Sequence, residues 1–197
     1  MDRRDFFRKS FGKAAEVVVK TADKRVSERS KHWIRPPYAI PELEFLLACT
    51  RCGACNEACP HNVIFPLAAR LGADVVNTPA LDLLKKGCHL CEDWPCVKAC
   101  ETGALVIKYE NDKQEVVEKF ANAIIDESLC LPFSGPECGA CIYACKIEGV
   151  LQLVQEKPVI NQQLCVGCGL CREACVVEDK AIQITSVGVK LQESPSA

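Results

Sequence analysis

Hydrophobic and polar residues alternate with a helical period near the start of the chain. Apolar side chains recur there at steps of three or four residues, with Lys and Glu between them, and this spacing is typical of a helix with one apolar face. The recurring positions are Phe7, Phe11, Ala14, Val18 and Ala22. We therefore predict an amphipathic helix of about five turns within an N-terminal arm, residues 1–35.

Prolines interrupt this pattern directly after the arm. Pro36, Pro37 and Pro41 follow in close order, and proline cannot continue a helix because it lacks the backbone N–H. We place the start of the body at this hinge, and the body extends over residues 36–186. The tail, residues 187–197, follows the last predicted strand and is predicted to be loose from Gln192 onward.

Short apolar segments separated by polar turns predict the elements of the body. The expected helices are a short helix from Glu42 to Ala48 and a helical turn from Pro66 to Leu71, which Gly72 closes before an extended segment from Ala73 to Asn77. The expected strands are Ala104 to Tyr109, Asn122 to Asp126, a hairpin of Val150 to Val154 with Pro158 to Asn161, and Ala181 to Thr185. Glu110 to Gln114 is predicted to be a turn, and Glu115 to Ala121 fits either a helix or a strand.

Cysteine is the residue that most changes this picture. The 197-residue chain contains 16 cysteines, and all of them fall into four runs of four. The runs are Cys49, Cys52, Cys55 and Cys59; Cys88, Cys91, Cys96 and Cys100; Cys130, Cys138, Cys141 and Cys145; and Cys165, Cys168, Cys171 and Cys175. Each run is followed by a short segment of apolar residues, so the chain reads as four repeats of one unit.

The first run identifies the chemistry that the others share. Its spacing is C-x2-C-x2-C-x3-C-P, which is the iron-sulfur run of bacterial ferredoxins. Two alternatives are a disulfide framework and zinc sites. A disulfide framework predicts scattered cysteines in a secreted chain, and zinc sites usually bring together two separated pairs. Tight runs of four thiols favour iron-sulfur clusters, and we predict all sixteen cysteines to be cluster ligands.

The repeat also predicts the fold class. One unit is a cysteine loop, a short helix that begins near the third or fourth cysteine, and a strand, and two such units make a dicluster ferredoxin. Four units therefore predict an α+β chain with two bacterial dicluster ferredoxin-like modules and four 4Fe-4S clusters. Aromatic residues make up only 6% of the chain, so we expect the clusters to organise the core and cluster insertion to be coupled to folding.

Charge divides the chain into a basic arm and an acidic body. Residues 1–35 contain eleven Lys or Arg and five Asp or Glu, which gives a net charge of +6. The remainder contains 13 basic and 21 acidic residues, which gives a net charge of −8. The arm therefore fits three roles: packing on its own body, docking on a partner protein, or peripheral contact with an anionic membrane surface.

The N-terminal residues bear on the cellular location of the protein. Arg3 and Arg4 resemble the start of a twin-arginine export signal, which would imply a periplasmic protein. Charged residues such as Lys13, Glu16 and Lys20 interrupt the apolar stretch that such a signal needs. We therefore expect a cytoplasmic protein that can associate with a membrane, and no stretch of 18 uncharged apolar residues predicts a transmembrane span.

Few other residues indicate chemistry. Gly53, Gly139, Gly167 and Gly169 lie in or beside the ligand loops, where a positive φ is expected. His61 and His89 lie next to predicted ligands and could hydrogen-bond a cluster, but we interpret them as structural residues because each is isolated in the sequence. No nucleotide-binding, flavin or nucleophile motif is present, so we expect an electron carrier and no catalytic residue. The alternative is an assembly or maturation factor for an oxidoreductase, with structural or sensory clusters.

The chain resembles the NapG/MauM ferredoxin-type family over roughly Ile34 to Ile184. The resemblance rests on Arg35-Pro36-Pro37 with Glu44-Phe45-Leu46, on the second run followed by Thr102-Gly103-Ala104-Leu105, and on Cys165-Val166-Gly167-Cys168-Gly169. The seven-residue gap between Cys130 and Cys138 is its most discriminating feature. The chain is similar more loosely to NapF-type ferredoxins and to the iron-sulfur subunits of molybdopterin oxidoreductases.

The resemblance implies an electron relay between a quinol-oxidising membrane protein and a terminal redox enzyme. We expect a redox partner protein of this kind and no nucleic acid. Likeness to the molybdopterin oxidoreductase subunits would pair runs one and four around two clusters, and runs two and three around the other two. The short separation between Cys145 and Cys165 equally suits runs three and four as an ordinary dicluster pair, so the pairing of the runs is open at this point.

Overall fold

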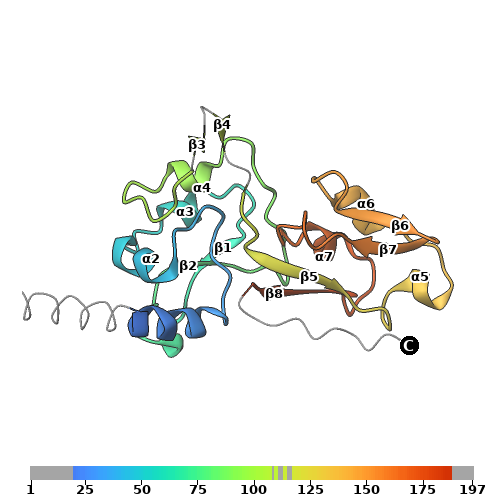
Figure 1. The fold of residues 1–197 in the computed structure, drawn as a ribbon, viewed down its shortest axis with the longest axis horizontal. Helices are drawn as coiled ribbons and strands as arrows, with labels where there is room; N and C mark the ends of the chain where they lie inside the picture. Colours follow the sequence, from blue (N-terminus) through green and yellow to red (C-terminus); the bar gives the residue numbers. More distant parts are fainter. Residues whose placement is uncertain (1–19, 108, 111–112, 115–116, 188–197) are drawn as a thin grey trace, which may run out of the picture.

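The structure is a computed structural model that describes residues 20–107, 109–110, 113–114 and 117–187. Two lobes lie side by side, and both are built from short helices and two-stranded antiparallel sheets (Figure 1). We call them the N-terminal module, residues 34–107, and the C-terminal module, residues 117–187. This mixture of short helices and strands confirms the predicted α+β class.

The N-terminal module contains one small sheet and a single bridge. Its elements are α2 (Glu42–Ala48), α3 (Ala54–Glu57), β1 (Ile64–Pro66), the 3-10 helix η1 (Ala69–Leu71), β2 (Pro79–Leu81) and α4 (Pro95–Lys98). β1 and β2 pair antiparallel, while the two ends of the module meet only at an isolated bridge between Ala39 and Leu105. The prolines on either side of Ala39 supply no backbone N–H to a longer ladder, which explains why this pairing stays so short.

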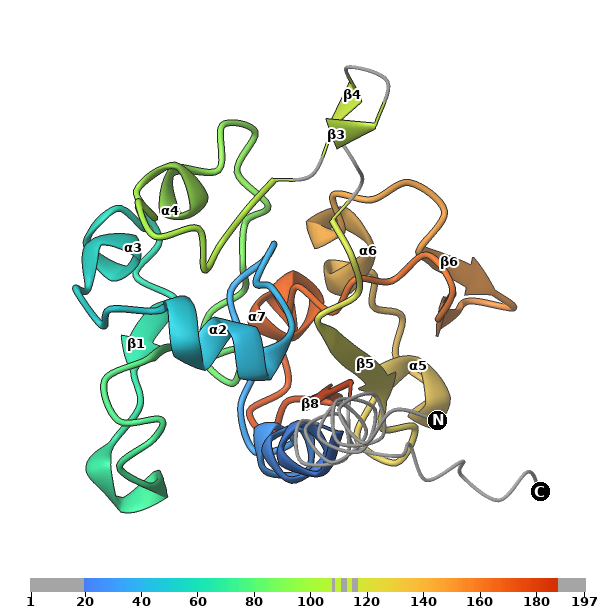
Figure 2. The ribbon, with the colours of Figure 1, turned by 60° about the vertical axis from the view of Figure 1, so that its left-hand side comes forward.

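The C-terminal module has two sheets that enclose its helices. Its elements are β5 (Ala121–Ile125), α5 (Leu131–Ser134), α6 (Ala140–Ala144), β6 (Leu151–Val154), β7 (Lys157–Ile160), α7 (Leu170–Ala174) and β8 (Ile182–Ser186). β6 and β7 form a hairpin, and β5 pairs antiparallel with β8, so the two ends of the module lie together. Between the modules, β3 (Tyr109–Glu110) and β4 (Lys113–Gln114) form a hairpin that projects from the body (Figure 2).

Several predicted elements are confirmed at nearly their predicted bounds. The helix from Glu42 to Ala48 is α2, the hairpin is β6 with β7, and the other two confirmed strands are β5 and β8. Each cysteine run also carries its short helix around the third cysteine, in α3, α4, α6 and α7. The cysteine loop and short helix of the predicted unit are therefore present four times in the described residues, whereas its strand closely follows runs one, three and four only.

Other segments differ from their prediction. Residues 73–77 were expected to be extended, but they form consecutive turns between Gly72 and Asn77, both of which have a positive φ. The strand predicted from Ala104 to Tyr109 is reduced to the Leu105 bridge and the first residue pair of β3, because residues 106–107 have no ladder partner. The segment predicted as a turn, Glu110 to Gln114, lies in the β3–β4 hairpin.

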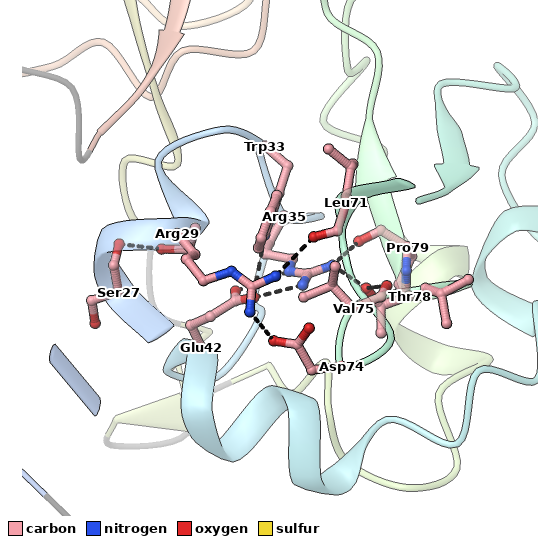
Figure 3. Close-up of polar contacts among 12 residues, drawn as sticks. Ser27, Arg29, Trp33, Arg35, Glu42, Leu71, Asp74, Val75, Thr78 and Pro79 are labelled. Atoms are coloured by element: carbon pink, nitrogen blue, oxygen red, sulfur yellow. Dashed lines mark hydrogen bonds and ion pairs between the residues drawn. The ribbon is translucent and has the colours of Figure 1, made fainter. Parts of the chain in front are cut away.

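The described part of the arm is attached to the body. Residues 20–30 are helical, whereas residues 1–19 of the predicted arm helix and the tail from residue 188 lie outside the described residues. Arg29 forms an ion pair with Asp74 (2.6 Å) and donates to the Leu71 carbonyl (2.8 Å), as Figure 3 shows. Ser186 in β8 donates to the Lys31 carbonyl (2.9 Å). In the described parts of the chain, no helix combines the length and the apolar character that crossing a membrane needs.

A buried arginine fixes the entry of the chain into the N-terminal module. Arg35 forms an ion pair with Glu42 (2.6 Å), and the side chains of both residues are about one-tenth exposed. The same guanidinium donates to Thr78 Oγ1 (2.9 Å) and to the Pro79 carbonyl (2.7 Å), and it lies 4.5 Å from the centre of the Phe45 ring (Figure 3). Arg35 thus connects the proline hinge, α2 and β2, which together form one wall beside the first cysteine run.

The principal core extends through both modules. It includes Phe45 and Leu83 from the N-terminal module and Ala121 and Ile182 from the C-terminal module. Cysteines belong to this core: Cys96, Cys141, Cys165 and Cys171 are buried within it, and many of the others pack against it. The burial of the cysteines agrees with a core that is organised around what these cysteines hold.

Candidate iron-sulfur cluster sites

The short helices place the third and fourth cysteines of each run on opposite sides of a loop. Cys141 lies within α6 and Cys171 within α7, and both helices end at the fourth cysteine of the run, Cys145 or Cys175. These two end residues have extended backbone angles, so the chain leaves the helix abruptly. The fourth thiol is thereby directed away from the three that precede it.

A left-handed residue precedes three of the four helices. Gly53 and Gly169 have φ of +80° at the start of α3 and α7, and Gly167 also has φ of +80°. The expected positive φ is wrong for Gly139, which has φ of −132° before α6. In the second run the left-handed residue is Trp94, with φ of 46°.

Trp94 is a site residue that the sequence pattern did not indicate. Non-glycine residues seldom adopt this conformation, and it persists only where the surroundings impose it. The Trp94 ring meets Tyr38 edge to face, with 4.9 Å between the ring centres, and it is buried. A bulky residue therefore occupies the turn that glycine makes in runs one and four.

Cys49, Cys52 and Cys55 of run one share a cavity with Cys100 of run two. We call these four residues group 1. The cavity has a volume of about 160 Å³, and Phe45, Phe65 and Leu105 supply apolar walls. Cys52 is exposed, whereas the other three thiols are partly buried. The backbone N–H of Leu105 donates to the Cys100 sulfur (3.3 Å), which is a contact typical of sulfur ligands in clusters.

Cys59, the last cysteine of run one, instead lines a hollow with three cysteines of run two. These residues form group 2: Cys59, Cys88, Cys91 and Cys96. Burial, together with the neighbouring thiols, raises the pKa of the Cys88 and Cys96 thiols to about 12. Thiols in this environment stay protonated at neutral pH unless a metal replaces the proton.

The C-terminal module repeats this exchange. Group 3 consists of Cys130, Cys138, Cys141 and Cys175, which line one hollow between Ile125 and Pro158. The four remaining cysteines form group 4, and within it burial and the nearby Cys145 raise the pKa of both Cys165 and Cys168. They are Cys145, Cys165, Cys168 and Cys171. Burial raises the pKa of the group 4 thiols of Cys168 and Cys171, to about 11 and about 12, and the charges of the other group members act in the same direction.

The pairing of the runs follows from these four groups. Each group takes three cysteines from one run and one from its partner run, which is the exchange that two-cluster ferredoxins make. Runs one and two are partners, and runs three and four are partners. The hollows bring run one together with run two and run three together with run four, which favours the ordinary dicluster pairing over the alternative in which run one pairs with run four.

The four groups fit 4Fe-4S clusters. All sixteen cysteines are free thiols, and a 4Fe-4S cluster takes four cysteine ligands. The thiols of groups 1, 2 and 3 line hollows, and in the described residues no three His, Cys, Asp or Glu are close enough to hold a single metal ion. A cubane presents a separate iron to each thiolate, which suits ligands arranged in this way.

Comparisons with known proteins identify the same chemistry. The 4Fe-4S binding domain family matches residues 47–65 and 158–175, which contain runs one and four. The chain is 33% identical to the methylamine utilization ferredoxin-type protein MauM of Methylophilus methylotrophus over 197 aligned residues, which cover 93% of this chain and 86% of MauM. It is also 33% identical to the ferredoxin-type protein NapG of Escherichia coli, with 92% of this chain and 82% of NapG covered.

The chain belongs to the NapG/MauM family of ferredoxin-type proteins. NapF of Escherichia coli, another ferredoxin-type protein, is more distant at 28% identity over 76% of this chain. No solved structure matches the chain. The resemblance drawn from Arg35, the cysteine runs and the Cys130–Cys138 gap is thereby confirmed, and this NapG/MauM protein is an iron-sulfur protein of the electron-transferring ferredoxin type.

Two histidines of this NapG/MauM protein are neighbours, although they were expected to be isolated. The rings of His61 and His89 stack with 3.5 Å between their centres and 5° between their planes. Burial lowers the pKa of His89, and the nearby His61 and Lys146 lower it further, whereas Glu173 raises it. His61 and His89 are far apart along the chain, so a local pattern could not predict their stacking. The stack brings the end of run one against run two.

Proposed function

We propose that this NapG/MauM protein binds four 4Fe-4S clusters, one in each cysteine group, with all sixteen cysteines as ligands. The observation that carries this proposal is the exchange of the fourth cysteine between partner runs, which completes four groups of four and leaves no thiol over. The same exchange joins the two cysteine loops of each module, so each module is built around a pair of groups. Each bound cluster supplies one-electron chemistry.

The protein then acts as an electron carrier that passes single electrons to or from a larger redox enzyme. A ferredoxin-type identity is shared with both NapG and MauM, and the proposed partner is an oxidoreductase subunit or a quinol-oxidising membrane protein. The exposure of residues at groups 1 and 3 supports this role. Cys52 of group 1 is exposed, and Val176, which directly follows Cys175 of group 3, is 63% exposed, so both modules give a partner access near a cysteine group.

The cluster count is tested by iron and sulfide analysis of anaerobically reconstituted protein. We expect about sixteen iron atoms and about sixteen sulfides per chain, since each cubane contains four of each. A result near eight iron atoms would contradict four clusters, and bound zinc in place of iron would contradict the cluster assignment altogether.

A second experiment separates an electron carrier from a maturation factor. The reduced protein is mixed with partner enzyme that is already fully assembled, and turnover of that enzyme is followed. A carrier raises the turnover in proportion to its own reduced clusters, whereas a maturation factor leaves an assembled enzyme unchanged.

We propose a cytoplasmic location, at the membrane face, for the same protein. The proposal rests on the charges that interrupt the apolar positions of the arm after Arg4. Fractionation of the native protein tests it, and recovery from the periplasm would overturn it in favour of twin-arginine export.

A further inference from the structure

The two modules meet through the loops that carry the cysteines of groups 2 and 4. The backbone N–H of Cys88 in group 2 donates to the carbonyl of Cys168 in group 4 (2.7 Å). One residue earlier, the N–H of Gly87 donates to the Glu173 carboxylate (2.8 Å). These are direct contacts between segments about 80 residues apart in the sequence, and both involve residues at or next to a ligand.

Three charged side chains reinforce this junction from the C-terminal module. Arg172 Nε donates to the Leu84 carbonyl (3.0 Å), and the other two contact the residues next to Cys88. Lys146 directly follows Cys145, and its ammonium donates to the His89 carbonyl (2.7 Å). Glu173 lies between Cys171 and Cys175, and besides accepting from Gly87 its carboxylate is 3.8 Å from His89 Nε2. One residue of each sign therefore extends from the loops of group 4 to the backbone on either side of Cys88.

The packing at the junction leaves no spare room. A side chain at Gly87 would place its Cβ 2.6 Å from the Leu170 nitrogen and 2.7 Å from its Cα. Leu170 begins α7, the helix that carries Cys171 of group 4. The loop of group 2 thus lies directly against the helix of group 4, and glycine at position 87 permits that approach.

Contacts between the elements place the four groups in a row. The helix that carries Cys55 of group 1, α3, packs against α4, which carries Cys96 of group 2. The N–H of Cys88 in group 2 donates to the carbonyl of Cys168 in group 4, and α7 of group 4 packs against α6, which carries Cys141 of group 3. The order in space is therefore group 1, group 2, group 4, group 3. This order differs from the order of the runs along the chain.

We propose that Lys146 and Glu173 are positioning residues that hold groups 2 and 4 close together, and that electrons pass between the two modules at this junction. The inference rests on the proposed four-cluster function. The covalent connection between the modules includes the β3–β4 hairpin, which projects from the body (Figure 2), so the separation of groups 2 and 4 is set by the noncovalent contacts around Cys88 together with the core that both modules share. Electron exchange between two centres slows steeply as their separation grows, so small movements here matter.

The test replaces both residues at once, as Lys146→Gln with Glu173→Gln, in the full-length, cluster-loaded protein. The control pair is Lys98→Gln with Glu178→Gln, which has the same change in charge. Lys98 and Glu178 are exposed, and each lies within three residues of a ligand but has no part in the junction. Because neither double variant changes the net charge, long-range electrostatic effects on the clusters are the same in the junction variant and in the control.

The first readout is electron paramagnetic resonance of the fully reduced protein, which reports magnetic coupling between neighbouring clusters. We expect the junction variant to lose the part of the coupling that arises between the modules, while the control pair and the conservative Lys146→Arg variant retain it. Unchanged coupling in the junction variant, with about sixteen iron atoms still bound per chain, would overturn the inference.

The second readout is amide hydrogen exchange, which does not depend on cluster spins. The Gly87 amide loses its carboxylate acceptor at Glu173, so its exchange should speed up about tenfold. The Cys88 amide, which donates to the Cys168 carbonyl, should also exchange faster because the junction opens more often, and the control pair should leave both amides protected. Equal protection in both variants would overturn the inference even if loading were incomplete. Failure of the four-cluster proposal is distinguishable, because it appears as a low iron count in the unmodified protein.

Discussion

At the scale of single residues, the fourth cysteine of each run has a different role from the three before it. Cys59 follows Cys55 by four positions, yet the two thiols belong to different groups, because the chain turns out of the short helix between them. Variants can therefore be designed by group or by run, and the two designs give different results.

Paired alanine variants test this membership. Cys59→Ala with Cys88→Ala removes two ligands from group 2 alone, so we expect loss of one cluster, or about four iron atoms per chain. Cys59→Ala with Cys49→Ala removes one ligand from each of groups 1 and 2, so we expect loss of about eight iron atoms. Iron analysis after reconstitution measures both, and equal losses in the two double variants would contradict the exchange between runs.

Gly167 is a residue whose conformation the fold requires. Its φ is +80°, and a Cβ at this position would overlap the backbone carbonyl of Ala121 at the start of β5. We expect Gly167→Ala to destabilise the protein by about 1–3 kcal/mol from backbone strain alone, and by more if β5 must move. Gly139→Ala is the matched control, because its φ is negative and its Cβ would meet only the Tyr143 ring at 3.4 Å. The urea concentration at which cluster absorbance disappears should fall for Gly167→Ala and stay unchanged for the control.

At the scale of elements, sequence periodicity predicted the regular strands and helices but not the shortest ones. β5 and β8 are five residues long and contain two and three β-branched residues respectively, and segments of this length and composition can be recognised as strands in a sequence. β1 and β2 have three residues each and include Pro66 and Pro79, and proline argues against a strand in sequence reasoning. Their pairing depends on tertiary contacts around Arg35 and Thr78, which local pattern cannot reveal.

The prediction of an extended segment at residues 73–77 was wrong for a related reason. Val75 and Val76 favour a strand by composition, but Val75 is 1% exposed and packs with Trp33, Leu67 and Ala80 in a second, smaller core. A turn that buries Val75 outweighs the weak β-propensity of two residues. The packing partner Trp33 precedes the segment by some forty residues, so it was not visible in a local window.

An Arg35 variant tests how much the contacts among these elements contribute to the stability of the N-terminal module. Removing one partner of a buried ion pair leaves the other charge without compensation, which costs about 3–5 kcal/mol, so Arg35→Ala should strongly destabilise the N-terminal module. Arg70→Ala is the control, because Arg70 is exposed on η1. Urea titration followed by cluster absorbance should show a large decrease in midpoint for Arg35→Ala only. A midpoint within error of the unmodified protein would show that Glu42 finds compensation from water.

At the scale of the whole molecule, cysteine spacing predicted the site chemistry but not its arrangement. The four runs indicated the cluster type, whereas the order of the groups and the junction at Gly87, Lys146 and Glu173 arise from contacts between distant loops. Trp94 shows the same limit, since its left-handed backbone depends on packing against Tyr38. Residues that bind a cofactor can be read from a motif, but residues that position two motifs against each other cannot.

The arm provides the last prediction, because its contacts with the body begin near residue 29. The ion pair of Arg29 with Asp74 and the contact of Ser186 with the Lys31 carbonyl hold the end of the arm in place. Deleting residues 1–26 leaves both contacts intact, whereas deleting residues 1–31 removes both. Exposed ion pairs contribute about 1 kcal/mol or less, so we expect a modest loss of stability for the longer deletion.

Both truncated proteins should still reconstitute with the iron content of the full-length chain, because no cysteine lies before Cys49. The shorter deletion should match the full-length protein in its urea midpoint, and the longer one should lose its cluster absorbance at a lower urea concentration. If the shorter deletion already lowers the midpoint, residues 1–26 contribute to the stability of the body. If both truncations match the full-length protein, the contacts of Arg29 and Lys31 contribute nothing measurable, and the arm acts only on a partner protein or a membrane surface.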